Sequence, residues 1–217
     1  MKRFIAALAV VAFAGTMATA SAGMQFGIRG QFNINQVAGD GFKDFGYDVK
    51  TGIGFGAGLV VKRHFTQQVS LVSETSLLYR TLSKMEVEME ETVYSIPSTI
   101  KIESSQHEMA LSLPLMLQVA PVKDMGLYLT AGIQLDFPFN SKFKFKADLI
   151  QNGQVVEKEE ATIDADGRSA VDFGIPMGLG YMITPNIGVD FRFVLGLIEY
   201  DDKTQLRAYA FGFTYIF

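Results

Sequence analysis

Residues 208–217 read Ala-Tyr-Ala-Phe-Gly-Phe-Thr-Tyr-Ile-Phe, and this stretch decides the fold. Every second residue from Tyr209 to Phe217 is aromatic, and most of the residues between them are small. Residues of one parity lie on the same face of a β-strand, so such a strand has one bulky face and one small face. The bulky face needs an apolar environment along its whole length.

The same alternation recurs in seven earlier segments, although it is less regular in the third. They comprise residues 24–34, 53–64, 69–82, 108–119, 127–140, 171–181 and 188–197. In each, bulky apolar residues occupy one face, and glycine, small polar and charged residues dominate the other. With 208–217 these segments predict eight strands and an all-β fold.

The connections between these segments alternate in length. Short ones follow the second, fourth and sixth segments, at 66–68, 121–125 and 184–186. Longer ones follow the first, third and fifth, at 38–51, 85–100 and 142–169, and a modest one at 199–203 follows the seventh. An Asn152-Gly153 turn predicts that the longest connection folds as a projecting hairpin. This alternation is typical of outer-membrane barrels, whose periplasmic turns are short and whose extracellular loops are long.

The size of the residues decides which face points outward. The interior of an eight-stranded barrel is just wide enough for side chains, so glycines such as Gly54 and Gly56 fit there and rows of Phe and Leu do not. The bulky face therefore points outward, into hydrocarbon. A soluble lipocalin-like barrel or sandwich, the alternative, would have to expose ladders of glycine to water. We predict an eight-stranded antiparallel up-and-down transmembrane β-barrel.

The N-terminal residues have the pattern of a signal peptide. Lys2 and Arg3 precede an apolar segment at 4–14, and Ala20-Ser-Ala22 is a typical cleavage site. We therefore expect a signal peptide at 1–22, a barrel domain at 23–217, and location in the outer membrane of a Gram-negative bacterium. An uncleaved N-terminal anchor is the alternative.

Composition narrows the possible partners and cofactors. Hydrophobic residues make up 48% of the chain and the mean hydropathy is +0.20. Removal of Lys2 and Arg3 would leave 17 basic and 23 acidic residues, a net charge of −6, so a nucleic-acid partner is not expected. The chain has no cysteine, which excludes a lipoprotein anchor, disulfides and a thiol metal site. With no metal or phosphate-binding motif in the sequence, we expect no cofactor and no metal.

Two neighbouring segments resemble a known family. Residues 107–119 are His-Glu-Met-Ala-Leu-Ser-Leu-Pro-Leu-Met-Leu-Gln-Val, and residues 126–132 are Gly-Leu-Tyr-Leu-Thr-Ala-Gly. They resemble the PorT-like porin family of outer-membrane barrels, which has a strand of the form L-x-I-P-L-L-L-K, a turn, and a strand ending in Y-x-x-A-G. The match is carried by Leu111, Leu113, Pro114, Leu115, Leu117, Tyr128, Ala131 and Gly132. Gln118 departs from the usual basic residue. The resemblance implies an outer-membrane barrel and a link with protein secretion, and it implies little about activity.

Charged residues on the predicted inward face are the main candidates for function. They are Arg29, Lys62, Glu74, Glu108, Asp136, Asp172, Asp190 and Arg192. Charges in a narrow lumen are costly unless they are paired or hydrated, so we expect a polar network that plugs the barrel. The alternative is a narrow channel that conducts ions or protons.

The remaining candidates lie at the strand ends and in the long connections. We expect no enzymatic activity. The alternative is a lipid A-modifying enzyme that uses His107 with Ser104, Ser105 and Glu103. An acidic run follows the third segment and a basic run follows the fifth, and Glu157, Glu159 and Glu160 follow the basic run. The opposite signs could pair the arms of the projecting hairpin, or the runs could bind divalent ions and lipopolysaccharide. These runs are Glu86, Glu88, Glu90 and Glu91, and Lys142, Lys144 and Lys146.

The last segment also predicts an interaction during assembly. Its aromatic row resembles the terminal strand that barrel assembly machinery recognises, and it comprises Tyr209, Phe211, Phe213, Tyr215 and Phe217. The expected partners are outer-membrane lipid and lipopolysaccharide, the assembly machinery, and an envelope or secretion complex.

Overall fold

The structure is a computed structural model that describes residues 23–38, 48–93, 96–123, 125–151, 154–164, 171–199 and 205–217. The predicted signal peptide at 1–22 and the predicted Asn152-Gly153 turn lie outside these residues. The strands are β1 (Met24–Ala38), β2 (Asp48–His64), β3 (Val69–Val93), β4 (Ile96–Val119), β5 (Leu127–Gln151), β6 (Gln154–Asp164), β7 (Asp172–Met182), β8 (Ile187–Glu199) and β9 (Gln205–Ile216).

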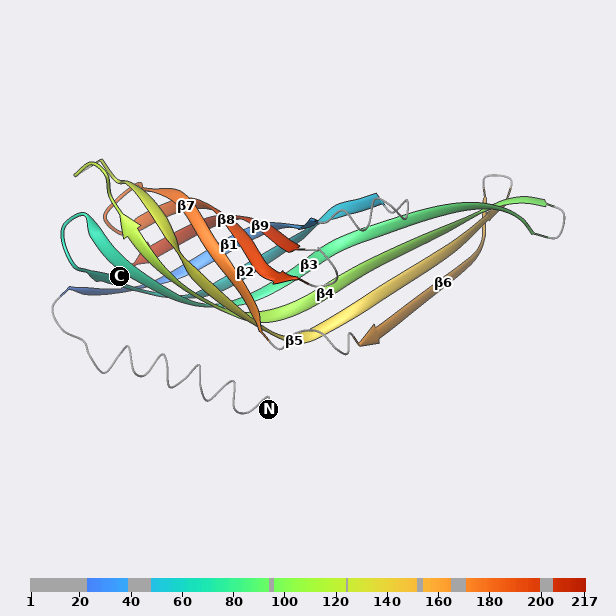
Figure 1. Ribbon diagram of the computed structural model, residues 1–217, viewed down its shortest axis with the longest axis horizontal. Coiled ribbons are helices and arrows are strands. Elements are labelled where there is room, and N and C mark those ends of the chain that lie inside the picture. Colours follow the sequence, from blue (N-terminus) through green and yellow to red (C-terminus); the bar gives the residue numbers. More distant parts are fainter. Residues whose placement is uncertain are drawn as a thin grey trace.

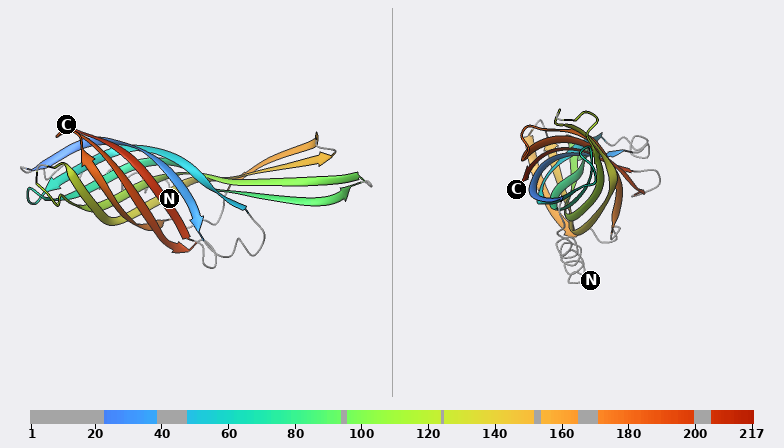
Figure 2. Two further views of the ribbon diagram at one scale, coloured as in Figure 1. Left: turned by 90° about the horizontal axis from the view of Figure 1, so that it is seen from above. Right: turned by 90° about the vertical axis from the view of Figure 1, so that its left-hand side faces the viewer.

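Eight of these strands close into a ring. The strand order is β4-β3-β2-β1-β9-β8-β7-β5-β6, and a further pairing of β4 with β5 joins the two sides of the sheet. All neighbouring strands are antiparallel. The end-on view in Figure 2 shows the ring. β6 pairs with β5 alone and is not part of the ring. The predicted eight-stranded up-and-down barrel is confirmed.

The two faces of the strands are distributed as the sequence predicts. Bulky residues point outward, and the Phe55 side chain is 63% exposed. Charged residues of the other parity point into the lumen, where Arg29 is 2% and Glu74 is 3% exposed. A row of exposed apolar side chains and a buried row of charged ones is the inverse of a soluble barrel, and it requires an apolar medium outside.

No helix in the described part of the chain is long and apolar enough to cross a membrane.

Three strands are much longer than the sequence predicts. The sequence predicts connections at 85–100 and 142–169, but β3 continues to Val93, β4 begins at Ile96 and β5 continues to Gln151. The hairpin predicted within 142–169 is confirmed by the antiparallel pairing of β5 with β6. These segments keep a period of two, with charged residues in place of glycine, and each pairs with a neighbour along its length. The expected strand boundaries at 82, 108 and 140 are therefore wrong.

The extended strands and β6 form a four-stranded sheet that projects from one end of the barrel (Figure 1). We call it the projecting sheet, and it comprises residues 84–93, 96–107, 142–151 and 154–164. Register shifts separate it from the barrel, between Thr81 and Lys84 on β3 and between Met109 and Ala110 on β4. Such β-bulges bend a strand and increase its twist, which lets the sheet leave the curvature of the barrel.

The opposite end of the barrel carries the short connections. Residues 65–68, 120–126 and 183–186 link β2 to β3, β4 to β5 and β7 to β8. We call this the short-turn end. The barrel is thus asymmetric along its axis, with tight turns at one end and a long sheet at the other (Figure 1).

Candidate functional site in the lumen

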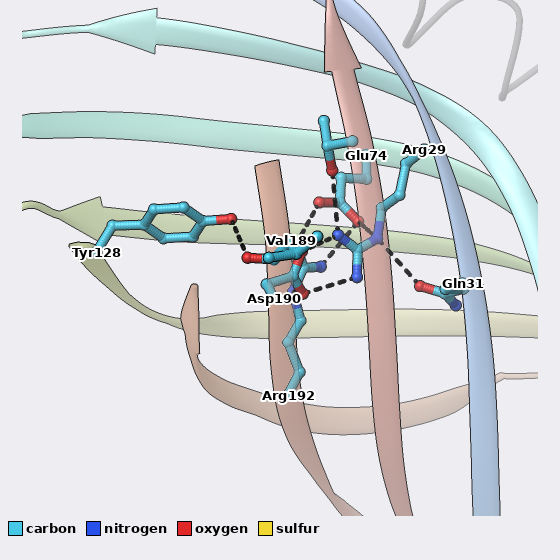
Figure 3. Close-up of polar contacts among 8 residues, drawn as sticks. Arg29, Gln31, Glu74, Tyr128, Val189, Asp190 and Arg192 are labelled. Carbon is cyan, nitrogen blue, oxygen red and sulfur yellow. Dashed lines mark hydrogen bonds and ion pairs between the residues drawn. The ribbon is translucent and has the colours of Figure 1, made fainter. Parts of the chain in front are cut away.

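Four charged residues meet across the middle of the lumen, and we call them the inner cluster. They come from β1, β3 and β8, and they are Arg29, Glu74, Asp190 and Arg192. Because β9, β1 and β2 separate β8 from β3 in the ring, the contact between Arg192 and Glu74 bridges the lumen rather than neighbouring strands. Figure 3 shows the four side chains converging on one point.

The inner cluster is a closed set of ion pairs. Arg192 donates two hydrogen bonds to the Glu74 carboxylate, at 2.7 and 2.9 Å. Its Nε lies 2.9 Å from Asp190 Oδ1. Arg29 donates from both terminal nitrogens to Asp190, at 2.8 Å from Nη2 to Oδ1. Two guanidinium groups face two carboxylates, so the cluster is electrically neutral when all four groups are ionised.

Small residues make room for these long side chains. A Cβ atom on Gly212 would collide with the Arg29 guanidinium, and one on Gly180 would collide with the Tyr128 ring. Arg29 also donates from Nε to Gln31 Oε1 at 3.2 Å. The inward glycines therefore do what their size suggests: they give space to the charged network in a narrow barrel.

A second group lies nearer the projecting sheet, and we call it the outer cluster. It comprises Arg80 on β3, Glu108 on β4, Asp136 on β5 and Asp172 on β7. Arg80 donates from Nε to Glu108 at 2.5 Å, from Nη1 to Asp136 at 2.9 Å and from Nη2 to Asp172 at 3.1 Å. One guanidinium therefore holds the carboxylates of three other strands.

Arg80 is absent from the predicted set, although it is the centre of the outer cluster. It has the same parity on β3 as Glu74 and is 3% exposed. Parity is the signal that identifies it, because the third segment at 69–82 includes Arg80 on the same face as Glu74.

Lys62 is the predicted lumen residue that stays apart from both clusters. It is buried near the short-turn end and forms no ion pair with any described residue. It lines an open recess of about 680 Å³ with His64 and Tyr128. The other seven predicted charges are all in ion pairs of the inner or outer cluster.

Little space remains inside the barrel beside the outer cluster. A cavity of about 30 Å³ is lined by Arg80, Asp136 and Asp172, among others. This volume holds one or two water molecules. Within the described residues, no group of three or more His, Cys, Asp or Glu side chains is arranged to hold a metal ion.

The structure brings together only some of the residues of the alternative enzyme site. Ser105 Oγ lies 3.1 Å from His107 Nε2, while Ser104 has the opposite parity on β4. The other ring nitrogen, Nδ1, lies 3.1 Å from Thr81 Oγ1 and 3.3 Å from the Tyr79 hydroxyl. The nearest groups at Nδ1 are therefore hydroxyls and not the carboxylate that orients a catalytic imidazole.

The aromatic row of the last strand lies on the outer face of β9. Phe211, Phe213 and Phe217 are all exposed. The rings contact those of the neighbouring strand, with 5.0 Å between the centroids of Phe191 and Phe211 and 5.3 Å between those of Phe193 and Tyr209. The row is thus continuous with the apolar outer surface of β8.

Comparison with solved structures finds membrane barrels at low sequence identity. Ail, the attachment invasion locus protein of Yersinia pestis, is 15% identical, with 91% of this chain and 100% of that chain covered and a TM-score of 0.45. Neisserial surface protein A is 13% identical, with 88% and 97% covered and a TM-score of 0.37. OprG from Pseudomonas aeruginosa is 14% identical, with 90% and 96% covered and a TM-score of 0.33.

No curated protein sequence matches the chain. A family model does: the model of the outer membrane protein beta-barrel domain matches residues 14–202. This match spans most of the chain and agrees with the closed ring of eight strands. The protein therefore belongs to the family of the outer membrane protein β-barrel domain, and it lies in the outer membrane.

Proposed function

We propose that the protein is a non-enzymatic barrel whose lumen is plugged by side chains and whose recognition surface is the projecting sheet. The observation that carries the proposal is the ion pairing of the inner cluster across the lumen, with Arg192 bound to both Glu74 and Asp190. The outer cluster crosses the lumen at a second level through Arg80. A solute would have to pass both.

The energetics favour a closed state over a gated one. Removing one partner of a buried ion pair costs about 3–5 kcal/mol, because the other charge is left without compensation. Both clusters would have to open for a hydrated ion to pass, and the cavity of about 30 Å³ beside the outer cluster is too small for the Arg80 side chain to retract into. A narrow channel, the alternative, needs a continuous hydrated path through both levels.

Conductance in planar lipid bilayers tests this proposal. The wild-type protein is expected to give no stable open level. The double variant Arg80→Ala, Arg192→Ala, which removes a guanidinium that crosses the lumen at each level, is expected to produce discrete openings, whereas Arg192→Ala alone leaves the outer cluster in place and should stay closed. Long-lived openings of defined size in the wild-type protein would overturn the plugged lumen and favour the channel.

The projecting sheet supports the second half of the proposal. Every residue of β6 is exposed, and the face of the sheet that continues the lumen side carries apolar side chains, among them Met89 and Phe145 at 41% and 37% exposed. Such side chains on a surface away from the apolar band of the barrel suit contact with another macromolecule. A partner in an envelope or secretion complex, as the PorT-like resemblance implies, is expected to cross-link to a photoreactive residue at position 145 and not to one at position 117 on the barrel wall.

Two further roles concern the ends of the chain. The outward row from Tyr209 to Phe217 is proposed to be the signal for the assembly machinery, and deletion of Phe217 is expected to lower the yield of folded protein in the outer membrane. Residues 1–22 are proposed to be removed on export. The mass of the protein purified from the outer membrane should then correspond to a chain that begins at Gly23.

A lipid A-modifying activity has one contact in its favour, between Ser105 and His107. Nucleophilic catalysis by serine needs an imidazole that is itself oriented, most often by a carboxylate. The hydroxyls of Thr81 and Tyr79 occupy that position here. We therefore propose no catalysis at this pair, and an unchanged lipid A mass spectrum on overexpression is the expected result.

A further inference from the structure

The surface between the barrel and the projecting sheet carries an unexplained group of basic residues. Its position follows from the strand register. Tyr79 and Met109 are paired on the outward face of the barrel, and the next pair on that face is Thr81 with His107. Ser105, two residues further along β4, pairs with Lys84 on one side and Lys144 on the other. The row Lys84-Ser105-Lys144 therefore continues the outer, lipid-facing surface.

These residues line a recess in the protein surface. It has a volume of about 360 Å³, and Lys84, Lys144, Lys146, Ser105 and His107 contribute to its walls. Glu86, Glu103 and Ser104 also line it. The recess opens on the outside of the sheet and has no connection with the clusters of the lumen, whose side chains have the opposite parity.

The lysines of the recess carry more positive charge than its carboxylates neutralise. Glu86 is engaged by Lys101, which also lies 3.7 Å from Glu103. The hydrogen bond to Glu86 is the main reason that the pKa of Lys101 is raised. Among the described residues, Lys84 and Lys144 form no ion pair. Two ammonium groups thus face the recess without a carboxylate partner.

The recess lies at a defined depth. A strand rises about 3.3 Å per residue, so Ser105 is roughly 13 Å along β4 beyond Met109, or about 10 Å along the membrane normal once the strand tilt is included. The headgroup region of a bilayer extends several ångströms to either side of the hydrocarbon core. The outward apolar row of β4 extends from Val119 to Met109 and ends there, so the recess, which begins at His107, lies just above the apolar band, at the height of lipid headgroups.

We propose that this recess binds a phosphoryl group of a phosphorylated lipid in the outer leaflet, that is, of lipid A. Lysine ammonium groups bind phosphate as point charges, and Ser105 and His107 supply further hydrogen-bonding groups. The acyl chains of the same lipid would lie on the outward apolar row of β4 below. The inference rests on the proposed function, in which the projecting sheet is the recognition surface, and on the orientation of outer-membrane barrels, whose short turns lie in the periplasm and whose long connections lie outside the cell.

Native mass spectrometry of the full protein in a neutral detergent tests the proposal. Bisphosphorylated lipid A and the same lipid A with its phosphates removed are titrated separately. The protein is expected to bind one bisphosphorylated molecule and not the dephosphorylated one at the same concentration, and the mass of the bound lipid should be unchanged. Equal binding of the two lipids would overturn a phosphoryl site.

The double variant Lys84→Gln, Lys144→Gln is expected to bind about 30-fold more weakly, since each lysine at an anionic membrane surface contributes about fivefold. Lys84→Arg, Lys144→Arg keeps the charge and should retain most of the binding. The matched control is Lys123→Gln, Lys158→Gln, which removes two positive charges away from the recess and should bind as the wild type does. Undiminished binding by the first variant would refute the site.

Inorganic phosphate distinguishes the source of the phosphoryl group. If millimolar phosphate does not displace lipid A, the lipid is the ligand; displacement would show a site for free phosphate and overturn the commitment to lipid. The folded state of each variant is checked by its migration on electrophoresis without heating. Lipid binding and conductance are separate readouts, so a barrel that conducts ions and still binds lipid A would refute the proposed plug and leave the site intact.

Discussion

β3 carries charged residues both in the barrel and in the projecting sheet, and the surroundings of these residues differ between the two regions. Within the barrel, Glu74 and Arg80 point into the lumen, and each is 3% exposed. Beyond the register shift at Thr81, the charges lie on the outer face of the projecting sheet, where the Glu88 side chain is 61% exposed. One strand therefore carries both a buried and a solvated set of ion pairs.

The comparison shows that the value of an ion pair depends on where the strand places it. In the lumen, ionised groups have lost most of their water, so each must be compensated and each is costly to remove. On the projecting sheet, water and salt screen the charges, and pairs of this kind contribute little to stability. The clusters of the lumen are compensated pairs away from water, while the charges of the sheet stay exposed to solvent.

The largest effect is expected from Arg192→Ala. It leaves Glu74 and Asp190 with Arg29 alone, so the barrel should lose about 3–5 kcal/mol of unfolding free energy. Denaturant unfolding in detergent micelles measures this. Lys101→Ala on the projecting sheet is the matched control and should leave the unfolding midpoint unchanged. If the two variants were equally stable, the distinction between buried and solvated pairs would fail.

A smaller effect is expected from a change that adds volume without removing charge. In Gly212→Leu, the new side chain would meet the Arg29 guanidinium and push it away from Asp190. Overpacking of this kind costs about 1–3 kcal/mol. Gly30→Leu is the control, because a Cβ atom at Gly30 would have nothing within 4 Å. Equal unfolding midpoints for the two leucine variants would show that the inner cluster tolerates displacement.

The smallest effect is expected for the titration of the Glu160 carboxyl on the projecting sheet. A hydrogen bond from Lys158, 3.2 Å away, and the charge of Lys146 lower the pKa of Glu160 from its ordinary value of 4.5. The folded pKa is the lower one, so any stabilisation by this pair is present above pH 4.5 and is lost as the pH falls through the lowered pKa. An NMR titration of the Glu160 carboxyl should have its midpoint below 4.5, and Lys158→Ala should move the midpoint upward. A midpoint that is unaffected by Lys158→Ala would mean that the pair does not form in solution.

The sequence alone predicts the number of barrel strands and the face on which each residue lies. Local alternation is sufficient for this, because side chains on a strand have a period of two whatever the strand pairs with. The inward position of Arg29 and Asp190, and the outward position of Phe211, follow from parity in this way. The short connections can also be predicted from the local sequence, since they interrupt the alternation.

The ends of the extended strands are not determined by that pattern. Residues 85–100 and 142–151 alternate as the barrel strands do, but with charged residues in place of glycine, so they also resemble solvated loops. Only the pairing of each segment with a neighbour made them strands, because an extended segment is stable when its backbone groups have partners.

What the sequence by itself determined is which residues enter the lumen and which face the membrane. What only the tertiary structure decided is which of the lumen charges meet, such as Arg192 with Glu74, 118 residues apart, and Arg80 with three carboxylates. The reason is physical: alternation sets the face of each residue, but its height in the barrel depends on the stagger with which all eight strands close, and that stagger is a property of the whole ring.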